Sequence, residues 1–480
     1  MTGPAGPSGP SHDDGTVGDL AIVLHSHMPY VEGFGTYPFG EEWLFDAVIR
    51  SYLPVLEVAR ELTMSVTPVL ADQLEDEGVQ QRLREFLVRY RLESARADVA
   101  DVPPECRDAA AAEARRYEHA LERLDGFGGD PLRAFQEAER DGRIAVMASA
   151  ATHALLPLLA TREGLRLQLD AGLRSHRRRF DWSGGLWLPE CGYAPGLEWE
   201  LAAHGVGWFC VDQTAWAEPL GALTPLRGEA GPVAFPIDWE AISWVWALDG
   251  YPSHPAHATF AGKSLRGTRI WKVGGGAYEP EAGEEAARAQ AGEFLAAVGA
   301  RLRSFREARR RRGLLVLAID TELLGHWWSE GPIWLAEVLR RAAAAGVALI
   351  TLPAALEAHD AQQAPLRAGS WGDGKDFRTW DCPAVADLAW AARRLELRLL
   401  AALAGGLRGE AALRATRELL AAQSSDWAFL DARGEAGDYP FQRATAHAEA
   451  MLQAIDSPRP PDPRMRALAP DLSLVPVLEP

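Results

Sequence analysis

Two acidic residues, Glu190 and Asp320, each follow an apolar run of the sequence. Glu190 lies in GGLWLPECGY at residues 184–193, and Asp320 ends the apolar part of LLVLAIDTELLGHWW at residues 314–328. Runs of this kind are typical of buried strands, so each carboxyl group is expected at the end of a strand. Two carboxyl groups that meet at strand ends can share bond cleavage, one as nucleophile and the other as proton donor.

Further polar side chains stand at the ends of other apolar runs. They are His25, His27, His153, Asp212, Glu322 and His326. In a parallel barrel the carboxyl ends of the strands converge on one mouth, so residues far apart in sequence can meet there. Any one of them alone is better explained as a core histidine or a helix cap, but together they predict a functional site.

Two chemistries fit these residues. In the first, Glu190 and Asp320 form the acid pair of a glycosidase, in which one attacks the anomeric carbon and the other protonates the leaving oxygen. In the second, the pair His25 and His27 binds a metal ion together with His153 and Asp320, as in a metal-dependent hydrolase. The H-x-H spacing is a weak signal on its own, and both chemistries stay open at this point.

The tryptophans favour a sugar ligand. The sequence has 17 Trp against 15 Phe and 9 Tyr, and flat indole rings stack well on sugar rings. Eight of them stand beside Gly, Pro or charged residues in expected loops: Trp187, Trp246, Trp271, Trp327, Trp328, Trp371, Trp380 and Trp427. We therefore expect several exposed stacking platforms, which a metal site would not need.

The elements that carry these residues alternate between apolar runs and helical patterns. LAIVLHSHMPYV is a continuous apolar run, and the helical pattern EEWLFDAVIRSYLPVLEVARELT follows it. Later runs, several of them separated by helical patterns, are RIAVMASAATHALLPLL, GVGWFCVD, GPVAFPIDW and VALITLPAAL. Strands separated by helices predict a parallel sheet, and six or seven such units favour a (β/α) barrel over an open sheet.

The chain divides into three parts by pattern. Residues 1–18 are rich in Gly and Pro and predict a flexible tail. Residues 19–360 are expected to form the catalytic barrel, with a helical insertion at about 73–142. Residues 361–480 predict a C-terminal all-helical domain that ends in a Pro-rich tail.

Composition excludes several classes of partner. The sequence has 49 Lys+Arg against 67 Asp+Glu, and its net charge of −18 repels nucleic acid and anionic membrane surfaces. No apolar run approaches the ~18 residues that cross a bilayer, and the N-terminus does not resemble a signal peptide. Four cysteines without C-x-x-C spacing predict reduced thiols. We expect a cytoplasmic protein that is a monomer or a small homo-oligomer.

Four segments resemble the motifs of glycoside hydrolase family 57: HSHMPYV, ATH at 151–153, WLPECGY and DTELLGHWW. YPFGEEWL, WALDGYP, SWGDG and SSDW are similar to segments of that family's α-1,4-glucan branching enzymes. The resemblance extends from about residue 20 to about residue 455. It implies an incomplete (β/α)7 TIM-like barrel with a helical insertion and a C-terminal all-helical domain.

The resemblance also implies roles for single residues. By motif match, Glu190 is the nucleophile and Asp320 the general acid/base of a retaining enzyme that needs no metal or other cofactor. The residues implied to bind the α-glucan substrate are His25, His27, His153, Asp212, Trp246, His326, Trp371 and Trp380. Glu322, together with His326, is expected to support Asp320 rather than to react.

The leading functional hypothesis is a 1,4-α-glucan branching enzyme, which cuts α-1,4 links and forms α-1,6 branches. Hydrolysis of α-1,4-glucan is the alternative within the same chemistry. It is suggested by residues 223–240, a short stretch without tyrosine that aligns with a cleft-covering loop of the relatives. Alternatives of other classes are a metal-dependent hydrolase and a catalytically silent glucan-binding protein.

Overall fold

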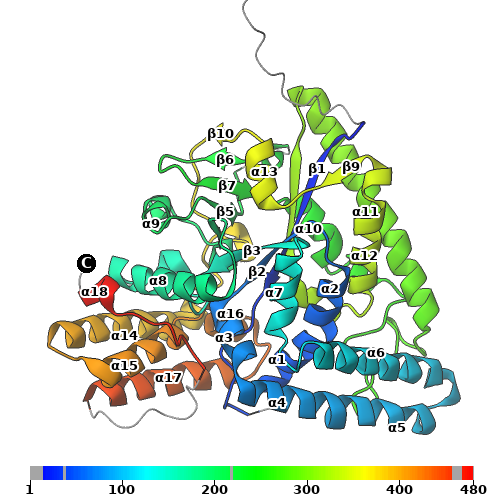
Figure 1. Ribbon diagram of the computed structural model, residues 1–480, viewed down its shortest axis with the longest axis horizontal. Coiled ribbons are helices and arrows are strands. Elements are labelled where there is room, and N and C mark those ends of the chain that lie inside the picture. The colour runs from blue at the N-terminus through cyan, green and yellow to red at the C-terminus, as the bar shows by residue number, and fades with distance from the viewer. Residues whose placement is uncertain (1–14, 36–38, 217–219, 457–466, 479–480) are drawn as a thin grey trace, which may run out of the picture.

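The core of the protein is a ten-stranded sheet, mostly parallel (Figure 1). The computed structural model describes residues 15–35, 39–216, 220–456 and 467–478. The strands run in the order β10-β6-β7-β5-β4-β3-β2-β1-β8, and β9 pairs with β1. Their bounds are β1 Gly18–Ser26, β2 Leu62–Val66, β3 Ile144–Ser149, β4 Gly185–Trp187, β5 Trp208–Val211, β6 Leu226–Arg227, β7 Val233–Pro236, β8 Leu314–Asp320, β9 Val347–Leu349 and β10 Gln362–Gln363.

Seven parallel strands, from β7 through β5, β4, β3, β2 and β1 to β8, form an incomplete barrel. Within the described residues no ladder joins β7 to β8, but the backbone N–H of Asp238 donates to the carbonyl of Val316 at 2.8 Å. The predicted incomplete (β/α)7 barrel is therefore confirmed. Strand β6 pairs antiparallel with β7, and β10 extends this edge.

Register brings the polar strand ends together. His25 of β1 lies opposite Ser65 of β2 on one side and opposite Asp320 of β8 on the other. The apolar residues Leu20–Leu24 that precede His25 are at most 1% exposed, because helices cover the barrel outside and side chains fill its inside. The buried strand thus delivers His25 to the mouth beside Asp320.

The helical insertion lies between β2 and β3, as predicted, and spans α3 to α7. Figure 1 shows α4, α5 and α6 together at the lower right. The helices up to the end of the barrel are α1 Glu41–Ala47, α2 Leu53–Val58, α3 Pro68–Glu75, α4 Glu77–Glu85, α5 Glu93–Asp101, α6 Arg107–Gly126, α7 Leu132–Arg140, α8 Arg162–Arg179, α9 Leu197–Ala203, α10 Trp239–Trp246, α11 Pro280–Arg309, α12 Gly331–Arg341 and α13 Leu352–Ala358.

The C-terminal part of the chain is helical from Ala386 onward. Helices α14, α15 and α17 pack against one another at the lower left of Figure 1. Residues 361–385 hold β10 and a long loop, so the division into domains at residue 361 stays a prediction. The N-terminal residues 1–14 and the Pro-rich residues 457–466 lie outside the described residues. The helices are α14 Ala386–Ala404, α15 Gly409–Ala422, α16 Ser425–Arg433, α17 Tyr439–Asp456 and α18 Val475–Leu478.

Residues 223–240 contain no long loop over the cleft, and the strand expected for the run GPVAFPIDW is confirmed. They contain β6, β7 and the first residues of α10. Phe235 pairs with Cys210 of β5 and is fully buried, because the apolar run VAFP completes the barrel wall. None of the described helices is both long enough and apolar enough to span a membrane.

Candidate active site

Two histidines at the end of β1 are each fixed by a hydroxyl group that β2 supplies. His25 Nδ1 lies 2.6 Å from Ser65 Oγ, and His27 Nδ1 lies 3.0 Å from Thr67 Oγ1. The His25 ring also stacks on Trp187 at 4.6 Å between centroids. Parallel pairing of β1 and β2 produces this arrangement, because residues 40 apart become neighbours on the two strands.

His153 completes a stack of three imidazole rings. Its ring centroid lies 4.0 Å from that of His27 and 4.8 Å from that of His25, with 24° between the planes in both cases. Burial lowers the pKa of His25 and of His153 well below the usual histidine value, so both rings are neutral. Their Nε2 atoms are buried and have no hydrogen-bond partner among the described residues. Neutral ring nitrogens of this kind can bond sugar hydroxyl groups.

Glu190 is held at both carboxylate oxygens. Ser425 Oγ donates to Oε1 at 2.7 Å, and the indole N–H of Trp371 donates to Oε2 at 2.8 Å. The backbone at Glu190 is left-handed, with φ 61°, a conformation that costs of order 1–3 kcal/mol in a non-glycine residue. The backbone of Tyr193 pairs in both directions with Gly369 and holds this turn. The carboxylate is therefore fixed in position, as a nucleophile requires.

Asp320 differs from Glu190 in its contacts. No described residue donates a hydrogen bond to its carboxyl group, although the carboxyl groups of Glu322 and Glu190 are neighbours. Burial, reinforced by these like charges, raises the pKa of Asp320 well above its usual value. Burial raises the pKa of Glu190 only to about 6, because hydrogen bonds from Ser425 and Trp371 oppose the effect. The surroundings of Asp320 therefore favour its protonated form, whereas the two donors to Glu190 favour its ionised form.

Helix α16 supplies two site residues that were not among the predicted ones. Ser425 contacts Glu190 as described, and Asp426 forms an ion pair with His27 at 2.9 Å. Burial acts to lower the pKa of His27, but nearby carboxylates, Asp426 above all, raise it. Burial acts to raise the pKa of Asp426, but His27 lowers it to about 2. The signal in the sequence was SSDW, a polar segment that begins a helix.

Asp212 stands at the end of β5, as predicted, and forms an ion pair with a lysine. Lys375 Nζ lies 2.9 Å from Asp212 Oδ2, and the Thr214 N–H donates to Oδ1 at 2.8 Å. The Lys375 ammonium group also lies over the Trp239 ring. Lys375 was missed in the sequence, where nothing links it to Asp212. A contact between Asp212 and the sugar stays a prediction.

The predicted tryptophans fall into two groups. Trp371 touches Glu190, and Trp246, at the end of α10, is 45% exposed. Trp380 is 2% exposed and stacks with Phe429. The expected exposure is wrong for four rings that pack in the interior: Trp187, Trp328, Trp380 and Trp427. Of these four, Trp187 ends strand β4 and Trp427 lies in helix α16, so neither stands in a surface loop. Glucan binding by Trp246 and Trp380 stays a prediction.

His326 lies outside the cluster around Glu190. Its ring meets Phe260 and Trp327 edge-on, at 5.4 and 5.1 Å between centroids. Burial lowers the pKa of His326 to about 3, and Arg269 is one of the charged groups near it. Within the described part of the chain no contact joins it to Asp320, so its expected support of Asp320 and its sugar contact both stay predictions.

The ligand set for a metal differs from the one that the sequence suggested. The nitrogen and oxygen atoms of His27, His153 and Asp426 lie within 4.8 Å of one another, and Asp320 does not belong to this group. The two rings are stacked, so their lone pairs lie in two nearly parallel planes, whereas the ligands of a tetrahedral ion converge on one point. His27 Nε2 is moreover paired with Asp426. This arrangement suits hydrogen bonds to hydroxyl groups better than a metal ion.

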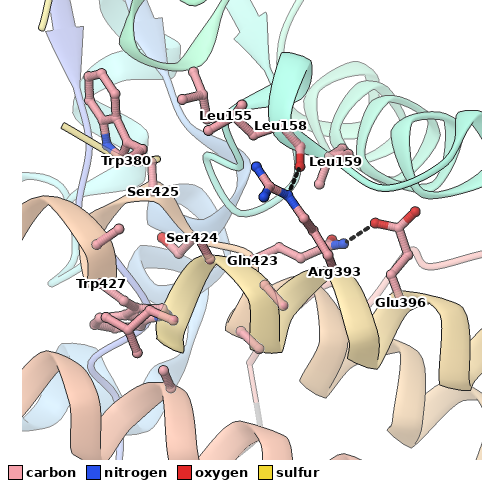
Figure 2. A pocket seen from close by; sticks show the side chains of 16 residues that line it. Leu155, Leu158, Leu159, Trp380, Arg393, Glu396, Gln423, Ser424, Ser425 and Trp427 are labelled. Atoms are coloured by element: carbon pink, nitrogen blue, oxygen red, sulfur yellow. Dashed lines mark hydrogen bonds between the residues drawn. The ribbon is translucent and has the colours of Figure 1, made fainter. Parts of the chain in front are cut away.

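A small cavity of about 70 Å³ adjoins the site (Figure 2). It lies between the turn Leu156–Leu158 and helices α14 to α16, and Ser425 belongs to its wall. Arg393 donates to the Leu158 carbonyl at 3.2 Å, and Gln423 donates to Glu396 at 2.9 Å. The cavity has room for a few water molecules.

Comparisons with known proteins agree with this geometry. The family model for glycosyl hydrolase family 57 matches residues 21–229, and the model for the C-terminal part of 1,4-alpha-glucan branching enzyme matches residues 389–469. A probable 1,4-alpha-glucan branching enzyme of Mycobacterium tuberculosis is 34% identical over 91% of each chain. A 1,4-alpha-glucan branching enzyme of Thermococcus kodakarensis is 31% identical over 90% of this chain and 72% of its own. The crystal structure of a branching enzyme of this family from Pyrococcus horikoshii superposes with a TM-score of 0.90, at 30% identity, covering 96% of this chain and 97% of its own. The chain therefore belongs to glycosyl hydrolase family 57.

Proposed function

We propose that this protein is a 1,4-α-glucan branching enzyme. The observation that carries the proposal is the asymmetry of the two carboxyl groups. Glu190 is held by two donors that favour its ionised form, whereas Asp320 has no donor among the described residues and lies in surroundings that favour its protonated form. The names of relatives that match most of the chain support the choice of an α-glucan as substrate.

The reaction proceeds in two displacements. Glu190 attacks the anomeric carbon of the donor glucan as the bond to the glycosidic oxygen breaks, and that oxygen takes the proton of Asp320. The Asp320 carboxylate then removes a proton from a 6-hydroxyl group of a second glucan, whose oxygen attacks the same carbon and displaces Glu190. Two inversions at one carbon retain the α configuration.

The surrounding residues hold the sugar during these steps. The unpartnered Nε2 atoms of His25 and His153 bond donor hydroxyl groups, and because both rings are neutral they do not disturb the charge on Glu190. Trp371 bonds the nucleophile through its N–H and presents its partly exposed ring to the substrate. No cofactor takes part in this scheme.

Hydrolysis uses the same first displacement, with water as the acceptor in the second. Residues 223–240 form strands and no long loop that could exclude water, so hydrolysis stays the alternative to be tested. One experiment separates the two activities: amylose is incubated with the enzyme, and new α-1,6 signals in the proton NMR spectrum are compared with new reducing ends. We expect α-1,6 signals to exceed reducing ends. Reducing ends alone would indicate a hydrolase, and no turnover would indicate a silent glucan-binding protein.

Two further statements belong to this proposal. Activity should persist in excess EDTA, and loss of activity that zinc restores would favour a metal-dependent hydrolase. We also propose a cytoplasmic location, because a reducing compartment suits the four free cysteines, Cys106, Cys191, Cys210 and Cys382.

A further inference from the structure

Glu322 is a third buried carboxyl group at the end of β8, two residues after Asp320. Its Oε1 atom accepts hydrogen bonds from the phenol of Tyr52 and, at 3.1 Å, from the backbone N–H of His27. Its own backbone carbonyl accepts the Trp327 N–H at 3.1 Å and the Ser51 hydroxyl at 3.4 Å. Glu322 is thus fixed from both sides beside a carboxyl group that has no such contacts.

The donors to Glu322 are neutral. Burial raises the pKa of Tyr52 well above its usual value, so the phenol keeps its proton, and a backbone amide carries no charge. The nearest cation is His27, which is already paired with Asp426. Burial raises the pKa of Glu322 to about 7, so this carboxyl group ionises near neutral pH. Above that pH its negative charge remains largely uncompensated in the direction of Asp320.

The groups that face Asp320 come from five elements. Glu322 follows it on the same turn, Glu190 follows β4, and Asp426 stands on α16. His25 pairs with it across β1 and β8, and Tyr52 comes from the turn before α2. The Glu190 carboxylate is tied to two donors and Asp426 to the His27 cation. Of these three acids, Glu322 is the one whose negative charge toward Asp320 is least compensated by neighbouring donors or cations.

We propose that Glu322 is a positioning residue for the general acid, and that its negative charge, once Glu322 is ionised, keeps the proton on Asp320 until the glycosidic bond breaks. The proposal rests on the role given to Asp320 in the proposed function. Once the glycosidic oxygen has taken that proton, two carboxylates stand side by side. Their repulsion favours the return of a proton to Asp320 from the acceptor hydroxyl group, as that oxygen bonds to the anomeric carbon and Glu190 leaves.

The test compares Glu322→Gln with the full-length wild-type enzyme on amylose from about pH 5 to about pH 9. Glutamine can still accept from Tyr52 and from His27, so only the charge is lost. We expect the alkaline limb of the kcat/KM profile to move down by at least about one pH unit, because the proton on Asp320 loses its repelling neighbour. Below that limb kcat/KM should stay within about threefold of wild type.

If Glu322→Gln does not fold, the comparison is repeated with two variants that have shorter side chains, Glu322→Asp and Glu322→Asn. The aspartate should keep the wild-type limb, and the asparagine should move it. Ser51→Ala is the control, because its hydroxyl contacts only the Glu322 backbone and the His326 N–H, and it should leave the limb in place. The proposal would be overturned if the alkaline limb did not move in Glu322→Gln and Glu322→Asn and if kcat/KM fell equally at every pH.

An α-glucosyl fluoride separates this proposal from the role of Asp320. Its fluoride leaves without a proton, so the alkaline limb of the first step should be absent for this donor in the wild-type enzyme. A limb that persists with the fluoride would contradict Asp320 as the acid, whatever the Glu322 variants show. Absence of all turnover in the wild-type enzyme would contradict the proposed function itself.

Discussion

Glu190 and Asp320 are both acids, and what they can do is decided by their neighbours. Hydrogen bonds to a carboxylate favour the ionised form, as Ser425 and Trp371 do for Glu190. Burial among like charges favours the protonated form, as for Asp320. The same two side chains with exchanged surroundings would exchange roles.

Replacement of the nucleophile should abolish turnover without unfolding the protein. Glu190→Gln keeps the shape of the side chain, and its one carbonyl oxygen can accept from Trp371 while Ser425 Oγ accepts from the amide NH2, but an amide cannot form the glycosyl-enzyme. We expect kcat on amylose to fall about a thousandfold or more, with an unchanged melting temperature. Glu198→Gln is a matched control, since Glu198 is also buried but bonds Tyr193 outside the site. Activity of Glu190→Gln within tenfold of wild type would refute the assignment.

Replacement of the acid should depend on the donor. In Asp320→Ala no group protonates the leaving oxygen of amylose, whereas fluoride needs no proton to leave. We therefore expect the first step with α-glucosyl fluoride to retain at least about a hundredfold more of its wild-type rate than the step with amylose. Equal losses with both donors would point to a structural role for Asp320.

The sequence predicted the members of this site better than their contacts. Motifs at strand ends identified His25, His27 and His153, and all three rings stack together. Ser425 and Asp426 were not predicted as site residues, because only folding brings them next to residues that lie far away in the chain. Proximity of that kind leaves no local pattern to read.

Helix α8 approaches β3 closely through Gly172, and this contact limits what the helix tolerates. A Cβ atom at Gly172 would lie 2.3 Å from the backbone oxygen of Ser149. Gly to Ala inside a helix ordinarily stabilises a protein by up to about 1 kcal/mol. Here we expect Gly172→Ala to lower the free energy of unfolding by about 1–3 kcal/mol, measured by urea denaturation.

The control for that substitution is Gly126→Ala in α6. No atom lies within 4 Å of a Cβ built at Gly126, so the ordinary helix preference should apply there. The expected change is between zero and a gain of about 1 kcal/mol. If Gly172→Ala also proved neutral or stabilising, the close packing of α8 on β3 would be disproved.

At the scale of elements, long apolar runs were predicted well and short ones poorly. Strand β1 and strand β8 span nine and seven residues, and both were evident in the sequence. Strand β4 has only three residues, but the apolar run before Glu190 predicted its position. The apolar run VAFP predicted a strand and forms β7, whereas β6 and β10, with two residues each, left no pattern to read.

The whole molecule should show a bell-shaped dependence of kcat/KM on pH. Glu190 must be ionised to attack, so activity should rise with pH through a value of about 6. Asp320 must be protonated, so activity should fall again at higher pH, where its raised pKa is reached. Rates on amylose across this range test both limbs. A profile that falls steadily from acid to neutral pH would contradict the ionised form of Glu190.

The place of α16 in the chain determines when catalytic competence arises during synthesis. A ribosome that has completed β8 has made every strand of the barrel, but the hydroxyl of Ser425 that steadies Glu190 and the carboxylate of Asp426 that charges His27 are roughly 100 residues away. At ~5–20 residues per second, that interval lasts from about 5 to about 20 seconds. The nascent barrel thus passes through this period with its histidines and acids in the chain but without the Ser425 hydrogen bond to Glu190 and without the partner of His27, and we expect it to cut glucan only after α16 has emerged and docked.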